Sequence, residues 1–289
     1  MRMLVTGCHG QLAQSLGARG GTDIILMGRP ELDLAIPGSA RTAILAARPD
    51  VIVNAAAFTA VDLAEAEEAE ARRINADAAG EIAAAAHELG VPVIHISTDY
   101  VFDGQASEPY AETAATGPIN AYGRTKLAGE EAVRAATPDH LILRTSWLVS
   151  PFGKNFVRTM VDLGQQRDTL SVVADQHGNP TSALDLADAI LVVARRWGAG
   201  ERTGIGQTFH LAGTAIASWF DLALAVQDEL ARLGANSARV VPITTADWPT
   251  PAARPQYSAL DTSNFTRDFG TTMPDWRVSL GPIVARLVA

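Results

Sequence analysis

A tyrosine and a lysine stand four residues apart in the segment AYGRTKLAGE, at Tyr122 and Lys126. On a helix, residues with this spacing lie on one face. The chain has only two lysines, so keeping one at this place suggests a need for a compact ammonium group. An ammonium beside a phenol favours phenolate, and bringing the pKa of a tyrosine from about 10 to about 7 requires roughly 4 kcal/mol. The pair predicts a tyrosine that gives a proton to a carbonyl oxygen at neutral pH, with a chance pair on a helix surface as the alternative.

The apolar run VPVIHIS ends in Ser97, and Thr98 follows it, 24 residues before Tyr122. In a parallel sheet, such a strand end reaches the carboxyl edge, where ligand-binding loops gather. A hydroxyl there can bind the same substrate oxygen as the tyrosine. We assign this role to Thr98 rather than Ser97, and the alternative for both residues is capping of the strand end.

A glycine turn follows the first apolar run, RMLVT, and leads directly into a helical pattern. Tight turns of this kind let backbone N–H groups and a helix N-terminus approach a diphosphate. We therefore predict a dinucleotide site, although glycine spacing alone is weak evidence and a purely structural turn is the alternative. Cys8 and His9 are treated as spacers in the turn, not as catalysts. The predicted cofactor-binding residues are Gly7, His9, Gly10, Gln11, Leu12, Arg29, Asp33, Leu34, Ala55, Ala56 and Ala57, together with Tyr122 and Lys126.

The end of the second apolar run bears on the choice of cofactor. An NAD site usually has an acidic residue there to hold the ribose 2′-hydroxyl. Here Arg29 stands in this region, and a guanidinium suits a 2′-phosphate. NADPH is therefore favoured, while Glu31 and Asp33 nearby leave NADH open. A solvated loop charge is the alternative for Arg29.

Apolar runs alternate with alanine-rich helical patterns in the first half of the chain, which predicts a parallel sheet covered on both faces. We expect strands at 2–6, 23–27, 31–34, 51–54, 91–97 and 141–146. We expect helices at 11–19, 38–48, 62–89 with a break near Asn75, and 121–136.

The pattern becomes irregular after about residue 150, with helices expected at 155–166, 183–196 and 218–233, and no regular structure at 247–258. The predicted fold class is α/β: a Rossmann-type doubly wound parallel sheet with a smaller C-terminal α/β substrate-binding lobe. Residues 1–150 and about 181–212 would form the dinucleotide-binding domain. Residues 151–180 and 213–289 would form the lobe.

Composition narrows the function classes. The chain has 289 residues, 47% of them hydrophobic, a formal net charge of −9 and one cysteine, Cys8. No apolar run reaches the roughly 18 residues of a membrane span, and the N-terminal pattern does not match a signal peptide, so we expect a cytoplasmic protein. The negative charge argues against nucleic acid and anionic membranes as partners. No cluster with metal-ligand spacing is present, so no metal is expected.

Several segments carry a family resemblance, in the order TGCHGQLA, NAAAFTAVDLAE, ISTDYVFDG, AYGRTKLAGE, LRTSWLVSPFGKNFV, ADQHGNPTS and RPQYSALD. In these the chain resembles the extended, sugar-nucleotide branch of the short-chain dehydrogenase/reductase superfamily, and within it the dTDP-4-dehydrorhamnose reductases. The resemblance implies NADPH-dependent reduction of the C4 keto group of dTDP-4-dehydro-L-rhamnose to give dTDP-L-rhamnose. The small-molecule partner would be this dTDP-sugar.

The resemblance also implies roles for individual residues. Tyr122 would be the proton donor, Lys126 would hold the nicotinamide ribose, and Thr98 would bind the C4 carbonyl oxygen. The sugar would be bordered by Thr59, Asp99 and Trp147, while Asn155, Lys154 and Arg254 are candidates for the nucleotide or its diphosphate. For Trp147, Asn155, Lys154 and Arg254, the alternative is packing or a surface position.

One departure concerns the metal that some family members are described as sharing between two subunits. An acidic ligand is described five positions beyond the second glycine of the turn, where this chain has Ser15. A bridging magnesium ion is therefore not expected, and both a monomer and a homodimer stay open.

Three other activities are alternatives to this reduction. A dehydratase or an epimerase of the same branch is one rival, but dehydratases place Asp-Glu after the catalytic threonine, whereas here Asp99 precedes Tyr100. A non-enzymatic NADP-binding regulatory subunit is another, and the intact Thr98, Tyr122 and Lys126 argue against it. A reductase acting on another deoxysugar is the third.

Overall fold

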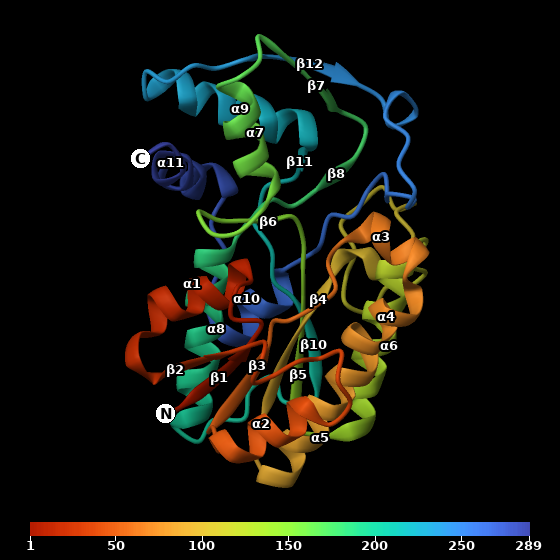
Figure 1. Ribbon diagram of the computed structural model, residues 1–289, viewed down its shortest axis with the longest axis vertical. Coiled ribbons are helices and arrows are strands. Elements are labelled where there is room, and N and C mark those ends of the chain that lie inside the picture. The colour runs from red at the N-terminus through yellow and green to blue at the C-terminus, as the bar shows by residue number, and fades with distance from the viewer.

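A single parallel sheet forms the base of the molecule (Figure 1). The computed structural model describes residues 1–289. Six strands pair in the order β10-β5-β4-β3-β1-β2. Their bounds are β1 (Met3–Thr6), β2 (Ile24–Met27), β3 (Val51–Asn54), β4 (Val93–Thr98), β5 (His140–Thr145) and β10 (Gln207–His210). The strand order reverses between β1 and β3, and ligands of doubly wound sheets bind at such a switch point. The predicted fold class is confirmed.

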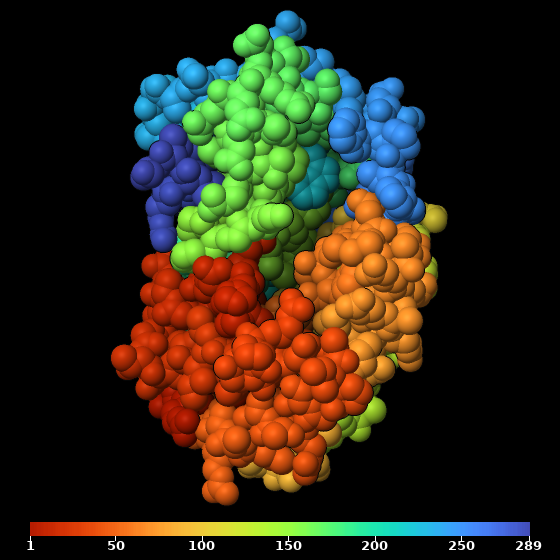
Figure 2. Space-filling model, viewed as in Figure 1, coloured from red at the N-terminus to blue at the C-terminus, as the bar shows by residue number.

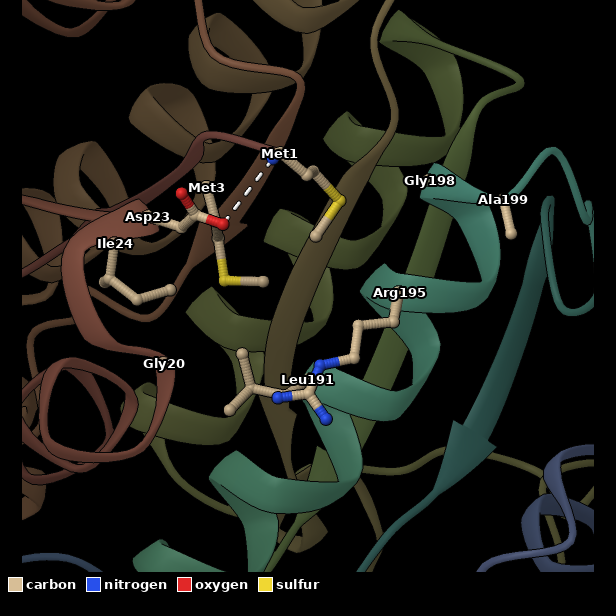
Figure 3. Close-up of a pocket in the computed structure, with 9 residues that line it drawn as sticks. All are labelled: Met1, Met3, Gly20, Asp23, Ile24, Leu191, Arg195, Gly198 and Ala199. Carbon is tan, nitrogen blue, oxygen red and sulfur yellow. Dashed lines mark ion pairs between the residues drawn. The ribbon is translucent and has the colours of Figure 1, made fainter.

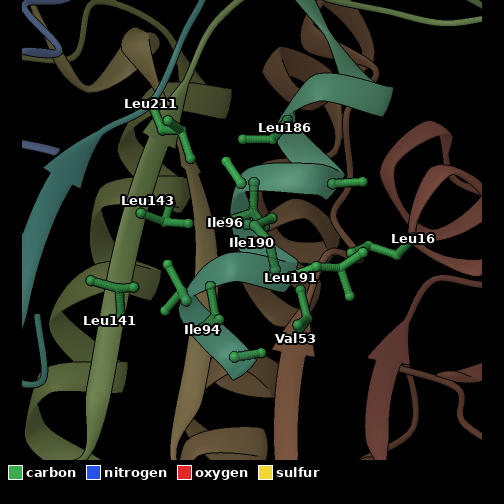
Figure 4. Packing of buried hydrophobic residues seen from close by; sticks show 14 of the residues in the cluster. Leu16, Val53, Ile94, Ile96, Leu141, Leu143, Leu186, Ile190, Leu191 and Leu211 are labelled. Carbon is green, nitrogen blue, oxygen red and sulfur yellow. The ribbon is translucent and has the colours of Figure 1, made fainter. Parts of the chain in front are cut away.

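Helices cover both faces of the sheet. On one face, α1 (Gln11–Gly20) packs against α8 (Ala183–Gly198). On the opposite face lie α2 (Ser39–Ala47), α5 (Ala78–Leu89) and α6 (Ala121–Ala136). Successive strand residues point to opposite faces, so Val53 joins the α8 side and Ile52 the α5 side. Figure 4 shows Ile190 of α8 packed among Val53 and Ile94. Strands buried on both faces need continuous apolar runs, which the sequence has.

The long helical segment after β3 is interrupted at Glu67 and widened at residues 73–77. It forms α3 (Val61–Ala66), α4 (Glu68–Arg72), a wide π-type turn η2 (Arg73–Asp77) and then α5. In this turn, the Asn75 side chain binds the backbone of Phe58 through two hydrogen bonds, of 2.8 and 3.2 Å. The predicted break near Asn75 is wrong, because the chain stays helical there and only widens; the interruption falls at Glu67, which was not predicted.

A second lobe stands above the carboxyl edge of the sheet (Figure 1). Three helices share its core, α7 (Phe156–Gly164), α9 (Trp219–Arg232) and α11 (Trp276–Val288). Its strands form two-residue to five-residue pairs: β7 (Thr169–Val173) with β12 (Arg239–Ile243), β8 (His177–Gly178) with β11 (Ala217–Ser218), and β6 (Leu148–Val149) with β9 (Thr181–Ser182). The predicted helices at 155–166, 183–196 and 218–233 are confirmed within a few residues, and 247–258 contains no helix or long strand beyond the last residue of a short 3-10 turn, η4 (Thr245–Asp247).

Capping side chains set where α8 of the first domain and α9 of the lobe begin. Ser218 forms a capping box with Asp221 at the start of α9, and Ser182 caps α8. These side chains bind backbone N–H groups that the first helical turn leaves unpaired. No helix of the structure has both the length and the apolar character that crossing a bilayer requires.

Several features differ from the sequence predictions, among them helix α11 and the strand pairs of the lobe, which were not predicted. Residues 31–34 form a turn rather than a strand. This loop buries the side chains of Leu32 and Leu34 in the core on the α2 side of the sheet. Strand β10 was missed, although 207–210 falls within the predicted first domain. Helix α10 (Ser263–Phe269) was also missed, and its aromatic rings pack on Phe209 of β10. This segment therefore packs with the sheet, not with the lobe to which 213–289 was assigned.

Candidate active site

A cleft of about 650 Å³ opens at the carboxyl ends of β1, β2 and β3. Figure 2 shows the hollow between the first domain and the lobe above it. We call this space the cofactor cleft. All predicted cofactor-binding residues from the turn and the strand ends line it: Gly7, His9, Gly10, Gln11, Leu12, Arg29, Asp33, Leu34, Ala55, Ala56 and Ala57. Thr59 and Lys154 line it too, whereas Tyr122 and Lys126 do not.

A second pocket, of about 380 Å³, lies at the opposite edge of the sheet (Figure 3). Met1, Met3, Ile24 and Leu191 give it an apolar lining, and its charged groups are Arg195 and an ion pair between the N-terminus and Asp23. None of the predicted site residues contributes to it. The candidate site is therefore at the carboxyl edge.

The glycine turn is shaped by close contact with the end of β3. Gly7 has φ of 81°, and a Cβ there would lie 3.0 Å from Cα of Ala56. The Gly10 N–H donates to the Gly7 carbonyl at 2.7 Å, and no side chain caps the start of α1. The uncapped N–H groups of the first turn are thus open to an anion, and a diphosphate fits the turn.

Cys8, the single free cysteine, is a spacer in this turn as predicted. Its N–H donates to the Met27 carbonyl at 3.2 Å, and its sulfur occupies the space beside Gly28, where a Cβ would lie 2.5 Å from Sγ. The side chain is half-buried and lines the cofactor cleft. Cys8 thus fixes the turn against the end of β2.

The loop after β2 brings charged groups to the cleft. Arg29 is exposed there and makes no ion pair. The Asp33 carboxylate accepts a hydrogen bond from the Ala35 N–H at 3.0 Å, so it holds its own turn. The free guanidinium and the engaged carboxylate fit a 2′-phosphate better than a bare 2′-hydroxyl.

Helix α6 brings Tyr122 to the end of β4. Its start is fixed by Asn120, whose side chain accepts from the Gly123 N–H at 2.8 Å. The Tyr122 hydroxyl lies close enough to the Thr98 side chain for this hydroxyl to act on its pKa, and the Tyr122 ring packs edge-on against Tyr100 with centroids 5.7 Å apart. The structure therefore joins the two residues that the sequence singled out as substrate-oxygen contacts.

Neighbouring Ser97 is differently engaged. Its hydroxyl donates to Glu130 at 2.6 Å in the protein interior, whereas the Thr98 hydroxyl donates to Asp99 at 3.0 Å. Ser97 is thus committed to a buried carboxylate, which agrees with the choice of Thr98 for the substrate. The roles themselves stay predictions.

The expected acidity of Tyr122 is wrong in this structure. Burial raises the pKa of Tyr122 to about 12, the Asp99 charge adds to the rise, and the hydrogen bond with Thr98 opposes it. The Lys126 ammonium is not among the groups that shift this pKa, and its Nζ donates to the Ile96 carbonyl at 2.7 Å. Tyr122 is therefore a neutral phenol at pH 7, which is the form that a proton donor needs.

Burial also shifts the other titratable groups of the site. It lowers the pKa of Lys126 to about 8, against the opposing charge of Glu130. It raises the pKa of Asp99 to about 6, against hydrogen bonds from Ser258 and Thr98. Both groups would change charge near neutrality, as groups in functional sites often do.

The remaining predicted substrate residues are held mainly by contacts within the protein. Trp147 has φ of 45° and stacks on Trp219 with centroids 3.5 Å apart. Asn155 caps α7 by accepting from the Arg158 N–H at 3.1 Å. Arg254 pairs with Asp62 at 3.0 Å. Their packing roles are present, and their contacts with a substrate stay predictions, as does that of the exposed Thr59.

Sequence reasoning missed the buried carboxylate beneath the site. Glu130 is fully buried and is bound by Ser97, Arg134 and Arg144. A signal was available: a glutamate stands four residues after Lys126 on the predicted helix, and an arginine interrupts the apolar run LILRTS.

Comparison with known proteins gives a consistent result. The family model described as RmlD substrate binding domain matches residues 1–289. A dTDP-4-dehydrorhamnose reductase of Sinorhizobium fredii is 46% identical, over 100% of this chain and 98% of the relative. A probable dTDP-4,6-dihydroxy-2-methyloxan-3-one 4-ketoreductase of Streptomyces antibioticus is 40% identical, over 97% of this chain and 93% of the relative.

A solved structure agrees with the geometry described above. The crystal structure of dTDP-4-dehydrorhamnose reductase from Bacillus anthracis in complex with NADP has a TM-score of 0.89 and 35% identity, over 98% of both chains. Matches of this extent, over the glycine turn, the strand ends and the lobe alike, establish the family. The chain belongs to the RmlD substrate binding domain family.

Proposed function

We propose that this protein is an oxidoreductase that reduces the C4 keto group of dTDP-4-dehydro-L-rhamnose to give dTDP-L-rhamnose, with NADPH as the hydride donor. The relatives named above support the reaction, and the NADP-bound structure supports the cofactor. The observation that carries the proposal is the contact between Thr98 and Tyr122 beside the cofactor cleft.

NADPH, when bound, supplies the hydride for the C4 carbon. The glycine turn would hold its diphosphate, and Lys126 would hold the nicotinamide ribose. The Thr98 hydroxyl would bind the carbonyl oxygen, and the Tyr122 hydroxyl would give that oxygen its proton as negative charge develops. Donors fixed in advance by the surrounding fold stabilise such charge without reorganisation.

The decisive experiment is NADPH oxidation with dTDP-4-dehydro-L-rhamnose generated in situ, followed by analysis of the product. We expect loss of NADPH absorbance that depends on the keto sugar, and dTDP-L-rhamnose as the product. Absence of oxidation with every dTDP-4-keto sugar offered would contradict the proposal and favour a regulatory subunit.

A second candidate is 4-keto reduction of a different deoxysugar nucleotide. The Streptomyces antibioticus relative supports it, because its name describes another 4-ketoreductase at 40% identity. The same assay separates the candidates: the alternative predicts slow turnover of dTDP-4-dehydro-L-rhamnose and faster turnover of a sugar with another configuration or oxidation pattern.

The free guanidinium in the cofactor cleft predicts a preference for NADPH. Replacing Arg29 with alanine should raise KM for NADPH roughly 10- to 100-fold, because a hydrogen bond to a charged group contributes about 1.5–3 kcal/mol. KM for NADH should change little, since NADH lacks the 2′-phosphate. Steady-state kinetics with both cofactors would measure this, with Glu31→Gln in the same loop as the control. Equal losses with both cofactors would contradict the role of Arg29.

The buried amine of Lys126 predicts opposite pH trends for activity and stability. Because burial lowers its pKa to about 8, turnover should fall above about pH 8 as the ammonium is lost. The unfolded-state pKa is about 10.4, so the cost of burying this charge decreases as the pH rises from 8 to 10. The contribution of Lys126 to stability should therefore rise while activity falls. Rate profiles and urea unfolding from pH 7 to 10 would test this, and parallel losses would contradict it.

A further inference from the structure

Three successive residues of β4 each face one residue of α6. The Ile96 carbonyl accepts from Lys126 Nζ, the Ser97 hydroxyl donates to Glu130, and the Thr98 side chain lies beside Tyr122. The two outer contacts involve the residues proposed to react. The middle contact, through Glu130, has no part in the chemistry described so far.

The Glu130 carboxylate is saturated with donors. Oε1 accepts from Ser97 Oγ at 2.6 Å and from Arg144 Nε at 2.8 Å, while Oε2 accepts from Nη2 of Arg144 at 2.8 Å and of Arg134 at 2.9 Å. Ser97 and Arg144 are direct partners in the register of β4 and β5. One carboxylate thus joins α6 to two adjacent strands at the level of the reacting residues.

Glu130 also supplies negative charge next to the Lys126 amine. Lys126 is 2% exposed, and the Ile96 carbonyl that binds it is neutral. Glu130 lies one helical turn away, and its charge opposes the effect of burial, which lowers the pKa of Lys126. Of the other titratable groups, His95 on β4 is close enough to interact with the Lys126 charge, while Arg134 on α6 and Arg144 on β5 act on Glu130.

We propose that Glu130 is a positioning residue for the reduction: its carboxylate joins α6 to β4 and β5, and so holds Lys126 in place and keeps Tyr122 beside Thr98. This inference rests on the proposed function. A buried ion pair is weak evidence for a contribution to stability, and the inference gives this one a role in positioning instead.

The test is Glu130→Gln, with Glu131→Gln as the matched control. Glu131 is the next residue on α6, and its side chain is exposed, so its replacement removes the same charge without touching the cluster. An opposite charge nearby shifts a pKa by about 1–3 units, so the alkaline limb of the kcat profile should move to lower pH by about one unit or more in E130Q. E131Q should keep the wild-type limb, and Glu130→Asp should restore most of it.

A binding measurement gives a readout that needs no substrate. NADPH affinity, followed by fluorescence titration from pH 6 to 10, should lose strength at lower pH in E130Q than in wild type. If E130Q does not fold, Arg134→Gln serves instead, because this side chain is 38% exposed and its removal takes a positive charge from the cluster. Its alkaline limb should move in the opposite direction, to higher pH.

The outcomes separate this inference from the proposed function. A folded E130Q with the wild-type alkaline limb in both turnover and NADPH binding would overturn the inference and leave the reductase assignment intact. An R134Q limb that stays in place or moves to lower pH would overturn it equally. Wild-type protein that binds NADPH but reduces no keto sugar would contradict the proposed function, while the binding profiles would still test Glu130.

Discussion

Replacing Tyr122 with phenylalanine should lower kcat by roughly 10²- to 10⁴-fold, the contribution that a positioned proton donor typically makes. NADPH affinity should stay within about twofold, because the predicted cofactor contacts in the glycine turn and the strand ends are untouched. The effect should be confined to kcat, since the lost proton transfer belongs to the chemical step. Single-turnover measurements of NADPH oxidation together with fluorescence titration of the cofactor would separate the two quantities.

Tyr100 provides the matched control for this variant. Its ring packs edge-on against Tyr122, and both tyrosines are half-buried. Removing the hydroxyl of Tyr100 alters the same pocket by the same atom but leaves the Thr98 contact in place, so Tyr100→Phe should change kcat only a few-fold. If Y122F turns over like wild type, or if Y100F loses as much activity as Y122F, the assignment of the proton donor is wrong.

The second large effect is expected at Gly129, where α6 meets the wide turn η2. A Cβ at this position would lie 2.1 Å from the Asn75 carbonyl oxygen, which is backbone and cannot rotate away. Forcing an extra methyl group into a packed interior typically costs about 1–3 kcal/mol, and more where the neighbour is rigid. Gly129→Ala should therefore lose stability in spite of the better helix propensity of alanine, and Tm should fall by about 2 °C for each kcal/mol lost, since the chain is long. Calorimetry or thermal unfolding followed by circular dichroism would measure the loss.

Gly80 is a control within the same helix pair. It lies in α5, and a Cβ there would be 3.3 Å from the Cβ of Ala132 on α6, a contact that small side-chain shifts can absorb. Gly80→Ala should be neutral or slightly stabilising, because alanine favours a helix by about 1 kcal/mol over glycine. A Gly129 variant as stable as the Gly80 variant would show that the backbone of η2 moves easily. This turn would then not fix the position of α6 beneath the site.

The sheet and the cofactor cleft were predictable because their determinants are local. Runs such as VIVN can only be central strands, and the glycine turn follows the first of them directly. Residues 31–34 were wrongly predicted to form a strand. Leu32 and Leu34, which anchor a loop in the core, alternate with other residues in the way that the buried residues of a short strand do. Strand β10 has the sequence QTFH and so lacks an apolar run, while α10 is short and packs on Phe209, which lies far away in the sequence.

The chemistry of the site was only partly predictable. Sequence spacing placed Tyr122 and Lys126 on one helix face, and the strand ending placed Thr98 at the edge. Spacing could not reveal that the Lys126 amine is held by Ile96, or that burial controls the pKa of Tyr122, because both depend on how closely α6 approaches β4. The role of Glu130 was hidden for the same reason: its partners come from two strands that are joined only in the folded protein.

A cysteine that stands alone in the chain and borders the cofactor cleft has a practical consequence. Thiol-directed reagents have a single destination in this molecule, the sulfur of Cys8, so a fluorophore or spin label can be attached there without engineering. Because the neighbouring glycines would approach a bound diphosphate, the label would sense whether a dinucleotide is in place. The rate at which Cys8 is labelled, with and without NADPH, would thus report cofactor binding in the unsubstituted protein.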